Sequence, residues 1–420
     1  MNAIASTVSF DPTFANKGVL RFNIPNATHA TATAVAIAPS GAIYVAGGVY
    51  DQDFDKFWIT RLNAEGTIDQ RFGENGFVID IFGPNEVSYP NSLSILSNGD
   101  IVLIGTTGLK HTALARYLEY GSPNLSFGNN GKVILDTRPD QPDTPRRFAT
   151  VQSRADRNAP HCVEMADGKI VITSLYIFSF PSHSASMIYR LNPNGSPDPT
   201  FAGTGHVAVQ HPDYEQQTTN IGLVVPQKDG KLLAAGIVTG GPNPRCTMFV
   251  RYLSDGSRDI SFGNDGYKLV PAPNYLFYRR LQRSDDGVVA VGTTLQAPFT
   301  GYLEAWRSDG SHDPEFNDGK PLLTSLNDQM TLFTDGFIDD DEKLMIAGVV
   351  LDSNERPDIV LARFNPDGTL DKTLDNKGWA LLPIGGDFNM PNALIPQADG
   401  KLLVAGEEGW GAFISRLMVG

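Results

Sequence analysis

The chain has 420 residues, of which 19% are charged and 42 are glycine. This composition favours short strands joined by tight turns over long helices. The formal net charge of −14 at pH 7 argues against a general binder of nucleic acid or of anionic membranes, because neutralising phosphates requires a basic surface.

Cysteine content and the absence of targeting signals limit the setting of the protein. Cys162 and Cys246 are the only two cysteines, too few for a disulfide framework. The start, MNAIASTVSF, lacks the basic and apolar regions of a signal peptide, and no apolar run reaches the roughly 20 residues of a membrane span. We expect a soluble monomer without a membrane span, either cytoplasmic or exported by a non-classical route.

A turn-rich string recurs from the N-terminus onward. It first reads FDPTFANKGVLRFNI at residues 10–24 and next GTIDQRFGENGFVID at 66–80. Its aromatic position recurs about every 60 residues, which indicates a repeat architecture. The seven positions are Phe14, Phe72, Phe127, Phe201, Phe262, Phe316 and Leu374.

Each repeat also contains an apolar hairpin, first AIAPSGAIYVAGG at 36–48 and last IPQADGKLLVAGE at 395–407. The Asn-Gly and Asp-Gly pairs in most of these hairpins favour type I′ turns, and the continuous apolar strand after the turn indicates burial on both faces. A third strand, the turn string and a fourth strand follow. We expect the small residue near the end of the second strand, such as Gly47, to allow close backbone packing.

Seven units of four strands predict an all-β fold, a seven-bladed β-propeller of four-stranded antiparallel blades. The chain begins with the fourth-strand part of a unit and ends after a third strand, so the N-terminal strand should complete the last blade and close the ring. We expect a single domain with blades at 31–82, 89–137, 160–211, 219–272, 278–326, 331–384 and 392–420 plus 10–24, and a long inserted loop at 138–160.

The repeated string, NPNGSPDPTFAGTGH at 192–206 and NPDGTLDKTLDNKGW at 365–379, resembles the delta-60 repeat family of bacterial propeller-like proteins. The resemblance covers nearly the whole chain and implies the fold, but it implies no particular activity and no catalytic residue. The sixth unit departs from the pattern at Glu342, where the hairpin glycine is expected, and at "NDGKPLL", which is one or two residues short.

An arginine of the third strand recurs in most units, eight residues before a turn aspartate or asparagine. These arginines are Arg61, Arg116, Arg190, Arg251, Arg363 and Arg416, with Ala305 as the exception. A ring of arginines suits a polyanion, but each guanidinium also suits the carboxylate of its own turn, and we favour this structural role. The same spacing predicts that Arg416 pairs with Asp11 across the closure.

The connections at the two ends of a blade differ in sequence. The first hairpin and the turn before the fourth strand are nearly uniform, whereas the loops between strands two and three and the links between blades vary. We call the variable end the loop face, and we expect any binding site there. Candidate ligand-binding residues are the basic residues of the inserted loop and several aromatic residues, namely Arg146, Arg147, Arg154, Tyr176, Phe180, Tyr278 and Trp410.

The leading functional hypothesis is a non-catalytic scaffold that presents the loop face to a protein or glycan, with no cofactor, no metal and no nucleic-acid partner. The alternative is a hydrolase or lyase whose histidine and acid groups, possibly with a metal, lie at the axial mouth near blades three and four. Its candidate residues are His161, His183 and His211. No HExxH or GxSxG pattern accompanies them.

Overall fold

The computed structural model describes residues 7–50, 55–108, 111–135, 162–179, 183–214, 218–240, 245–271, 275–294, 297–352, 354, 356–386 and 388–420. Within these ranges the side chains of residues 175–179, 183–184 and 275–280 are left aside. The chain divides into two compact units. The first unit contains residues 1–80, 275–307 and 312–420, and the second contains residues 81–274 and 308–311.

The first unit contains four blades, numbered here by the order of their sequence repeats. Blade 1 consists of β3 (His29–Ala30), β4 (Ala34–Ile37), β5 (Ile43–Tyr50), β6 (Asp55–Leu62) and β7 (Phe77–Asp80). Blade 5 consists of β20 (Tyr275–Gln282), β21 (Val288–Thr294), β22 (Gly301–Trp306) and β23 (Leu322–Thr324), with the 3-10 turn η2 (Asn317–Gly319) before its last strand. Blade 6 consists of β24 (Met330–Ile338), β25 (Leu344–Leu351), β26 (Pro357–Phe364) and β27 (Trp379–Leu382). Blade 7 consists of β28 (Asn389–Pro396), β29 (Leu402–Glu408), β30 (Gly411–Val419), β1 (Val8–Phe10) and β2 (Val19–Arg21).

The second unit contains the other three blades. Blade 2 consists of β8 (Ser88–Ile95), β9 (Ile101–Thr107), β10 (His111–Tyr117) and β11 (Lys132–Leu135). Blade 3 consists of β12 (Cys162–Glu164), β13 (Ile170–Ser179), β14 (His183–Leu191) and β15 (His206–Val209). After the 3-10 turn η1 (Pro212–Tyr214), blade 4 consists of β16 (Thr218–Pro226), β17 (Leu232–Thr239), β18 (Arg245–Tyr252) and β19 (Tyr267–Pro271). In blade 1, β3 and β4 both pair with β5 and together take the first-strand position. The fold is therefore the predicted seven-bladed β-propeller of four-stranded antiparallel sheets.

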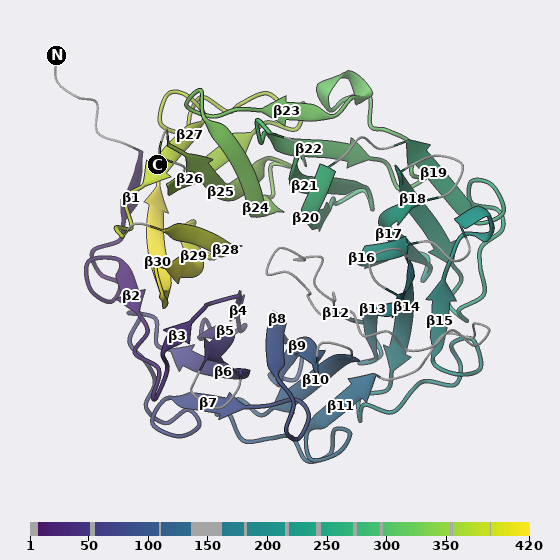
Figure 1. The fold of residues 1–420 in the computed structure, drawn as a ribbon, viewed down its shortest axis with the longest axis horizontal. Coiled ribbons are helices and arrows are strands. Elements are labelled where there is room, and N and C mark those ends of the chain that lie inside the picture. The colour runs from purple at the N-terminus through teal and green to yellow at the C-terminus, as the bar shows by residue number, and fades with distance from the viewer. Residues whose placement is uncertain are drawn as a thin grey trace. The chain divides into compact units, whose positions relative to one another are not determined.

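The two ends of the chain share blade 7, as the sequence predicts. The short strands β1 and β2 both pair with β30, so together they take the fourth-strand position (Figure 1). The register joins Val8 to Val419 and Val19 to Ser415. Between the two short strands, the backbone N–H of Asp11 donates to the carbonyl of Arg416 at 2.9 Å. The first residues of the chain thereby complete the sheet that the last residues begin.

The second strand of each blade forms much of the core, which explains its continuous apolar sequence. All seven residues of β9 are buried, and seven of the eight residues of β25 are buried. A Cβ atom on Gly47 would lie 1.7 Å from the carbonyl oxygen of Thr31, and one on Gly348 would lie 2.2 Å from that of Leu332. Glycine at this position therefore allows the first and second strands to approach closely, as predicted.

The first hairpin of the blades differs from the predicted type I′ turn. In blade 2, Gly99 has a φ of +86°, but Asn98 does not adopt a positive φ. The N–H of Gly99 donates to the carbonyl of Leu96 at 2.8 Å, and the N–H of Leu96 donates to the carbonyl of Asp100 at 2.8 Å. This is a three-residue hairpin in which a left-handed residue follows a type I turn. Glu342 takes the left-handed place in blade 6, with a φ of +59°.

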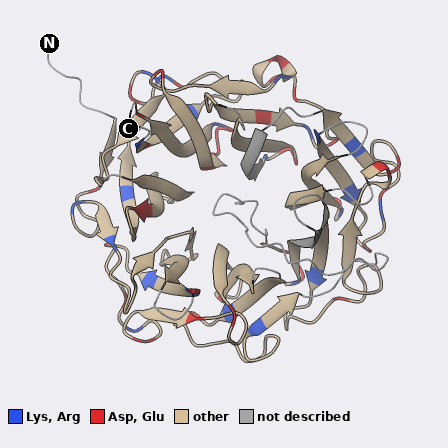
Figure 2. Cartoon of the chain, viewed as in Figure 1, with Lys and Arg blue, Asp and Glu red and all other residues tan. Residues whose placement is uncertain are grey.

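Charged residues are spread over the blades, and basic residues do not gather on one blade (Figure 2). Among the described residues, no helix has the length and apolarity that crossing a membrane requires.

Candidate functional site

The recurring aromatic side chain fills the space between consecutive blades. Phe201 of blade 3 has no exposed surface, and it lies under the turn of blade 4 that contains Gly256. A Cβ atom on Gly256 would lie 2.9 Å from Cδ2 of Phe201, and the N–H of Ala202 donates to the carbonyl of Asp255 at 2.6 Å. The same contact recurs within the units for the pairs Phe14 and Gly66, Phe127 and Gly195, and Phe316 and Gly368. The turn string is thus a joint between blades.

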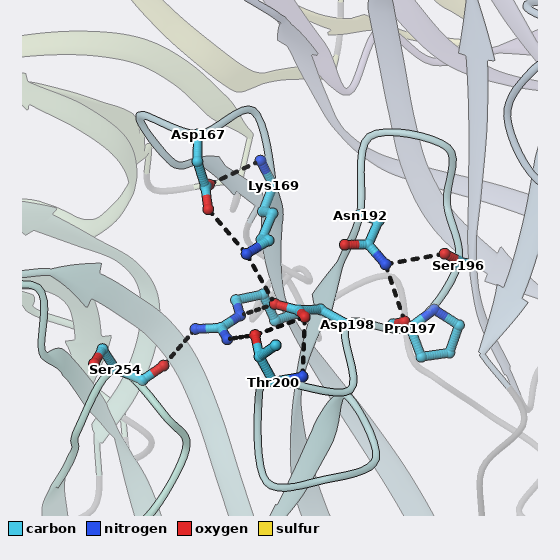
Figure 3. Close-up of polar contacts among 9 residues, drawn as sticks. Asp167, Lys169, Asn192, Ser196, Pro197, Asp198, Thr200 and Ser254 are labelled. Atoms are coloured by element: carbon cyan, nitrogen blue, oxygen red, sulfur yellow. Dashed lines mark hydrogen bonds and ion pairs between the residues drawn. The ribbon is translucent and has the colours of Figure 1, made fainter.

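The third-strand arginine binds the turn aspartate of its own blade. Arg190, only 5% exposed, places its guanidinium 4.8 Å from the centroid of the Phe201 ring, and its Nε donates to Oδ2 of Asp198 at 2.6 Å. Lys169 and Thr200 also contact this carboxylate (Figure 3). Burial alone would raise the pKa of Asp198, but hydrogen bonds from Thr200 and Arg190 lower it to about 2.

The arginine also reaches the next blade, a contact that the sequence does not reveal. Nη1 of Arg190 donates to the carbonyl of Ser254 at 2.5 Å (Figure 3). Arg116 donates in the same way to the carbonyl of Pro193 at 2.6 Å, and Arg416 to that of Ala64 at 2.5 Å. These guanidinium groups join neighbouring blades, which confirms the structural interpretation over a polyanion site.

Arg416 and Asp11 are partners across the closure, as predicted. Nε of Arg416 donates to Oδ2 of Asp11 at 2.9 Å, and the two residues are 7% and 2% exposed. Nη2 of Arg416 also donates to Thr13 at 3.1 Å.

Two blades preserve the arginine–carboxylate pair with different residues. In blade 2 the turn residue is Asn124, and Arg116 instead binds Asp100 from the first hairpin, with an Nε to Oδ2 distance of 2.7 Å. In blade 5, where Ala305 replaces the arginine, Arg283 of the first hairpin pairs with Asp313. The first hairpin thus supplies the carboxylate in blade 2 and the guanidinium in blade 5, an exchange that the spacing of residues in the sequence does not show.

Most of the predicted site residues lie where the structure gives no side-chain information. Arg146, Arg147, Arg154, Phe180 and His161 lie outside the described residues, as does the inserted loop 138–160. Tyr176 lies in β13, His183 begins β14 and Tyr278 lies in β20, with side chains that are left aside. Their proposed roles, including the hydrolase or lyase site, stay predictions. Trp410 and His211 have described side chains.

Trp410 is a prominently exposed aromatic residue on the loop face of blade 7. The residue lies in the turn that joins β29 to β30, and it is 74% exposed. The ring of His29 meets it edge-on, with centroids 5.0 Å apart, and His29 stacks in parallel on Tyr50 at 4.9 Å. The N–H of Ala30 donates to the carbonyl of Trp410 at 3.1 Å. An anchored loop therefore presents the indole to solvent.

The sequence interpretation missed His29 and Tyr50 as neighbours of Trp410. The available signal was the closure itself, because a ring closed between blades 7 and 1 brings the link that contains His29 to the loop of Trp410. A charged pair lies nearby on the same sheet. Nε and Nη2 of Arg21 bind the two oxygens of Glu408 at 2.5 and 3.0 Å. Phe388, 45% exposed, accepts a backbone hydrogen bond from Gly409 at 2.7 Å, next to Trp410.

His211 lines a cavity of about 610 Å³ in the second unit. The residue is 9% exposed, and its Nδ1 accepts a hydrogen bond from the backbone N–H of Asp213 at 3.2 Å. Burial lowers the pKa of His211, while the charge of Asp213 acts in the opposite direction. No group of three or more His, Cys, Asp or Glu that could hold a metal ion occurs among the described residues.

The seven blades and the repeated contacts between them define the protein as a β-propeller built from sequence repeats. A comparison with models of protein families agrees that it is a β-propeller. Residues 166–201, 227–262 and 340–374 match a family model described as "Domain of unknown function (DUF5122) beta-propeller". Each segment runs from the first hairpin of a blade to Phe201, Phe262 or Leu374. The match supports a β-propeller repeat family, and the finer resemblance to the delta-60 family stays a prediction.

No curated protein sequence matches the chain. Among solved structures, a protein of unknown function from Dyadobacter fermentans has 13% identity and a TM-score of 0.45, with 98% of this chain and 100% of that chain covered. Drosophila Semaphorin 1a, extracellular domains 1-2, has 10% identity and a TM-score of 0.48, with 96% and 88% covered. The polysaccharide lyase Uly1 has 11% identity and a TM-score of 0.45, with 95% and 91% covered.

Proposed function

We propose that the chain is a non-catalytic binding scaffold that engages a protein or glycan partner through the loop face, with Trp410 at the contact. The observation that supports this proposal is the exposure of an ordered indole. A large aromatic side chain that is 74% exposed leaves apolar surface in water unless a partner covers it.

The surroundings of Trp410 favour binding over a purely structural role. Its backbone is held by a hydrogen bond from Ala30 and its ring packs perpendicular to that of His29, so less conformational freedom is lost when a partner binds. Tryptophan is enriched among the residues that contribute most to binding, especially beside polar groups that form a rim. Arg21 and Glu408 supply such groups on the same sheet.

The repeated joints explain why the rest of the molecule can serve as a scaffold. In blades 3 and 7 the arginine, aspartate and phenylalanine of this turn string are buried and bonded within and between blades, so they are not available to a ligand. A rigid set of sheets with variable loops at one end is a common arrangement for binding proteins.

Replacing Trp410 with alanine should weaken binding of the partner by at least about 30-fold, the loss typical when a central interface tryptophan is truncated. The partner is first selected by screening the intact protein on a glycan array and against immobilised candidate proteins. Affinity for the selected partner is then measured by titration calorimetry for both variants.

Leu125→Ala is the matched control. Leu125 is 71% exposed but lies in the turn between β10 and β11 of blade 2, which is one of the uniform turns and not a variable loop. It should bind like the unmodified protein. Equal affinity of the Trp410→Ala variant, with an unchanged melting temperature, would place the binding surface elsewhere and contradict the proposal.

A further inference from the structure

A second feature, independent of Trp410, is the cavity beside blade 4. It lies along β19 and includes His211 and Asp213 from the link before blade 4, Asn264 from the turn, and Lys268 from the strand. Its volume of about 610 Å³ lies within the range of ligand pockets, about 300–1,000 Å³. The repeated joints account for Arg251, Ser261 and Phe262 in its wall, but not for His211 and Asp213.

His211 is held in one orientation by its neighbours. The centroid of its ring lies 4.7 Å from that of the Tyr267 ring. It lies 5.5 Å from the centroid of the Tyr214 ring, which is nearly perpendicular to it. Tyr267 is itself fixed, because its hydroxyl donates to the carbonyl of Gln210 at 2.7 Å and accepts from Arg258 at 3.1 Å. The packing of two tyrosines leaves His211 little freedom to turn.

The hydrogen bond at Nδ1 determines where the proton of His211 resides. Nδ1 accepts from the backbone N–H of Asp213, so the neutral ring carries its proton on Nε2. Burial is the largest influence on this pKa and lowers it, which favours the neutral ring at pH 7. Within the described part of the chain, no residue accepts a hydrogen bond from Nε2. His211 lines the cavity and its Nε2 retains access to solvent, so a ligand oxygen can replace water as the acceptor of this N–H.

The charges of the cavity do not favour an anion. Nε of Arg251 is already bound to Oδ2 of Asp259 at 2.8 Å. Lys268 directs its Nζ to the backbone carbonyl of Asp309 at 3.3 Å, and the carboxylate of Asp213 is 70% exposed. The wall therefore offers donors and acceptors in mixture without a net positive charge, next to the apolar surface of Tyr267 and Leu269.

We infer that this cavity is a binding site for a neutral polyhydroxylated ligand, a short saccharide, with Nε2 of His211 donating to a ligand hydroxyl oxygen. Hydroxyl groups both donate and accept, so they suit the mixture of Asn264, Lys268 and Asp213, while the C–H face of a sugar ring suits Tyr267. This site is distinct from the loop-face site and does not depend on it.

The test uses the full chain with ¹⁵N-labelled histidine. Maltotriose and cellotriose serve as neutral probes, and trigalacturonic acid and trilysine serve as charged probes. We expect a neutral trisaccharide to shift the Nε2 resonance of His211 in a saturable manner. The inference would be overturned if neither maltotriose nor cellotriose shifted the resonance at about 20 mM, or if only the charged probes shifted it.

Two variants locate the site by ligand-observed saturation transfer. His211→Phe keeps a ring against the two tyrosines but removes the Nε2–H donor, and it should weaken binding of the neutral trisaccharide by about tenfold, the loss expected for one hydrogen bond. Asn264→Ala, in the exposed turn, should weaken binding without affecting folding. Ile260→Ala, 69% exposed outside the cavity wall, is the control. Unchanged affinity in both His211→Phe and Asn264→Ala would overturn the assignment, while the Trp410 experiment would be unaffected.

Discussion

Replacing Arg416 with alanine should lower the free energy of unfolding by about 3 kcal/mol, because the change leaves the carboxylate of Asp11 buried without its main partner. Asp11 is 2% exposed and accepts from Nε of Arg416 at 2.9 Å. The variant also loses the bond to the carbonyl of Ala64 in blade 1 and the contact of the guanidinium with the ring of Phe14 at 4.7 Å. Lys401, whose Nζ lies 3.3 Å from Asp11, remains in place, so we expect the lower end of the range of about 3–5 kcal/mol for broken buried pairs.

The matched control lies in the same sheet. Arg21 is also paired with a carboxylate, that of Glu408, but its side chain is 53% exposed. Arg21→Ala should therefore change the stability by no more than about 1 kcal/mol. Urea denaturation followed by circular dichroism compares the two variants. If Arg416→Ala and Arg21→Ala lowered the free energy of unfolding equally, burial of the Arg416–Asp11 pair would not determine how much the pair contributes to stability.

Replacing Phe201 with alanine should lower the free energy of unfolding by about 3–5 kcal/mol, because it empties a fully buried site between blades 3 and 4. The ring touches the turn of Gly256 and lies against the guanidinium of Arg190. The turn cannot fill the space without breaking the hydrogen bond that the N–H of Ala202 donates to the carbonyl of Asp255, and the guanidinium cannot fill it without breaking its bond to Asp198.

A leucine at this position should be far less disruptive. Blade 6 already carries Leu374 at the equivalent place, fully buried and with its N–H bonded to the carbonyl of Asp371 at 3.0 Å. We therefore expect Phe201→Leu to cost about 1 kcal/mol. Thermal denaturation of both variants, with the exposed Phe388→Ala as a control for loss of an aromatic ring, measures the difference. A melting temperature for Phe201→Ala within one degree of the control would contradict the assignment of this residue as a joint.

The fold was predictable because each local signal repeats. The spacing of Phe14, Phe72 and their equivalents fixes the number of units, and the incomplete units at the two ends indicate the closure. The pair of Arg416 and Asp11 followed from the same spacing, although the residues lie at opposite ends of the chain. Because the same pattern occurs in several units, a departure in one of them, such as Glu342, does not change the fold that the sequence predicts.

The details that sequence did not reveal depend on contacts between blades or on the backbone. The hairpin of Asn98 and Gly99 was wrongly predicted as type I′, because the same residue pair also suits a type I turn followed by a left-handed glycine. The exchange of Asp100 for the turn aspartate in blade 2 is visible only when facing strands are in register. Trp410 was predicted as a site residue from its own loop, whereas its neighbour His29 was missed, because the predicted closure was not followed through to the links that it brings together.

The closure of blade 7 is the claim on which the loop-face site depends, because it brings the link of His29 to the loop of Trp410. Its most direct test replaces Ser9 and Met418 with cysteine. The two residues are directly opposite in the register of β1 and β30, and such pairs lie about 5.5 Å apart between Cα atoms, within reach of a disulfide. The account predicts that mild oxidation of the folded protein gives a cross-linked peptide containing residues 9 and 418, identified by mass spectrometry. Free thiols at both positions in the folded, oxidised protein would contradict it.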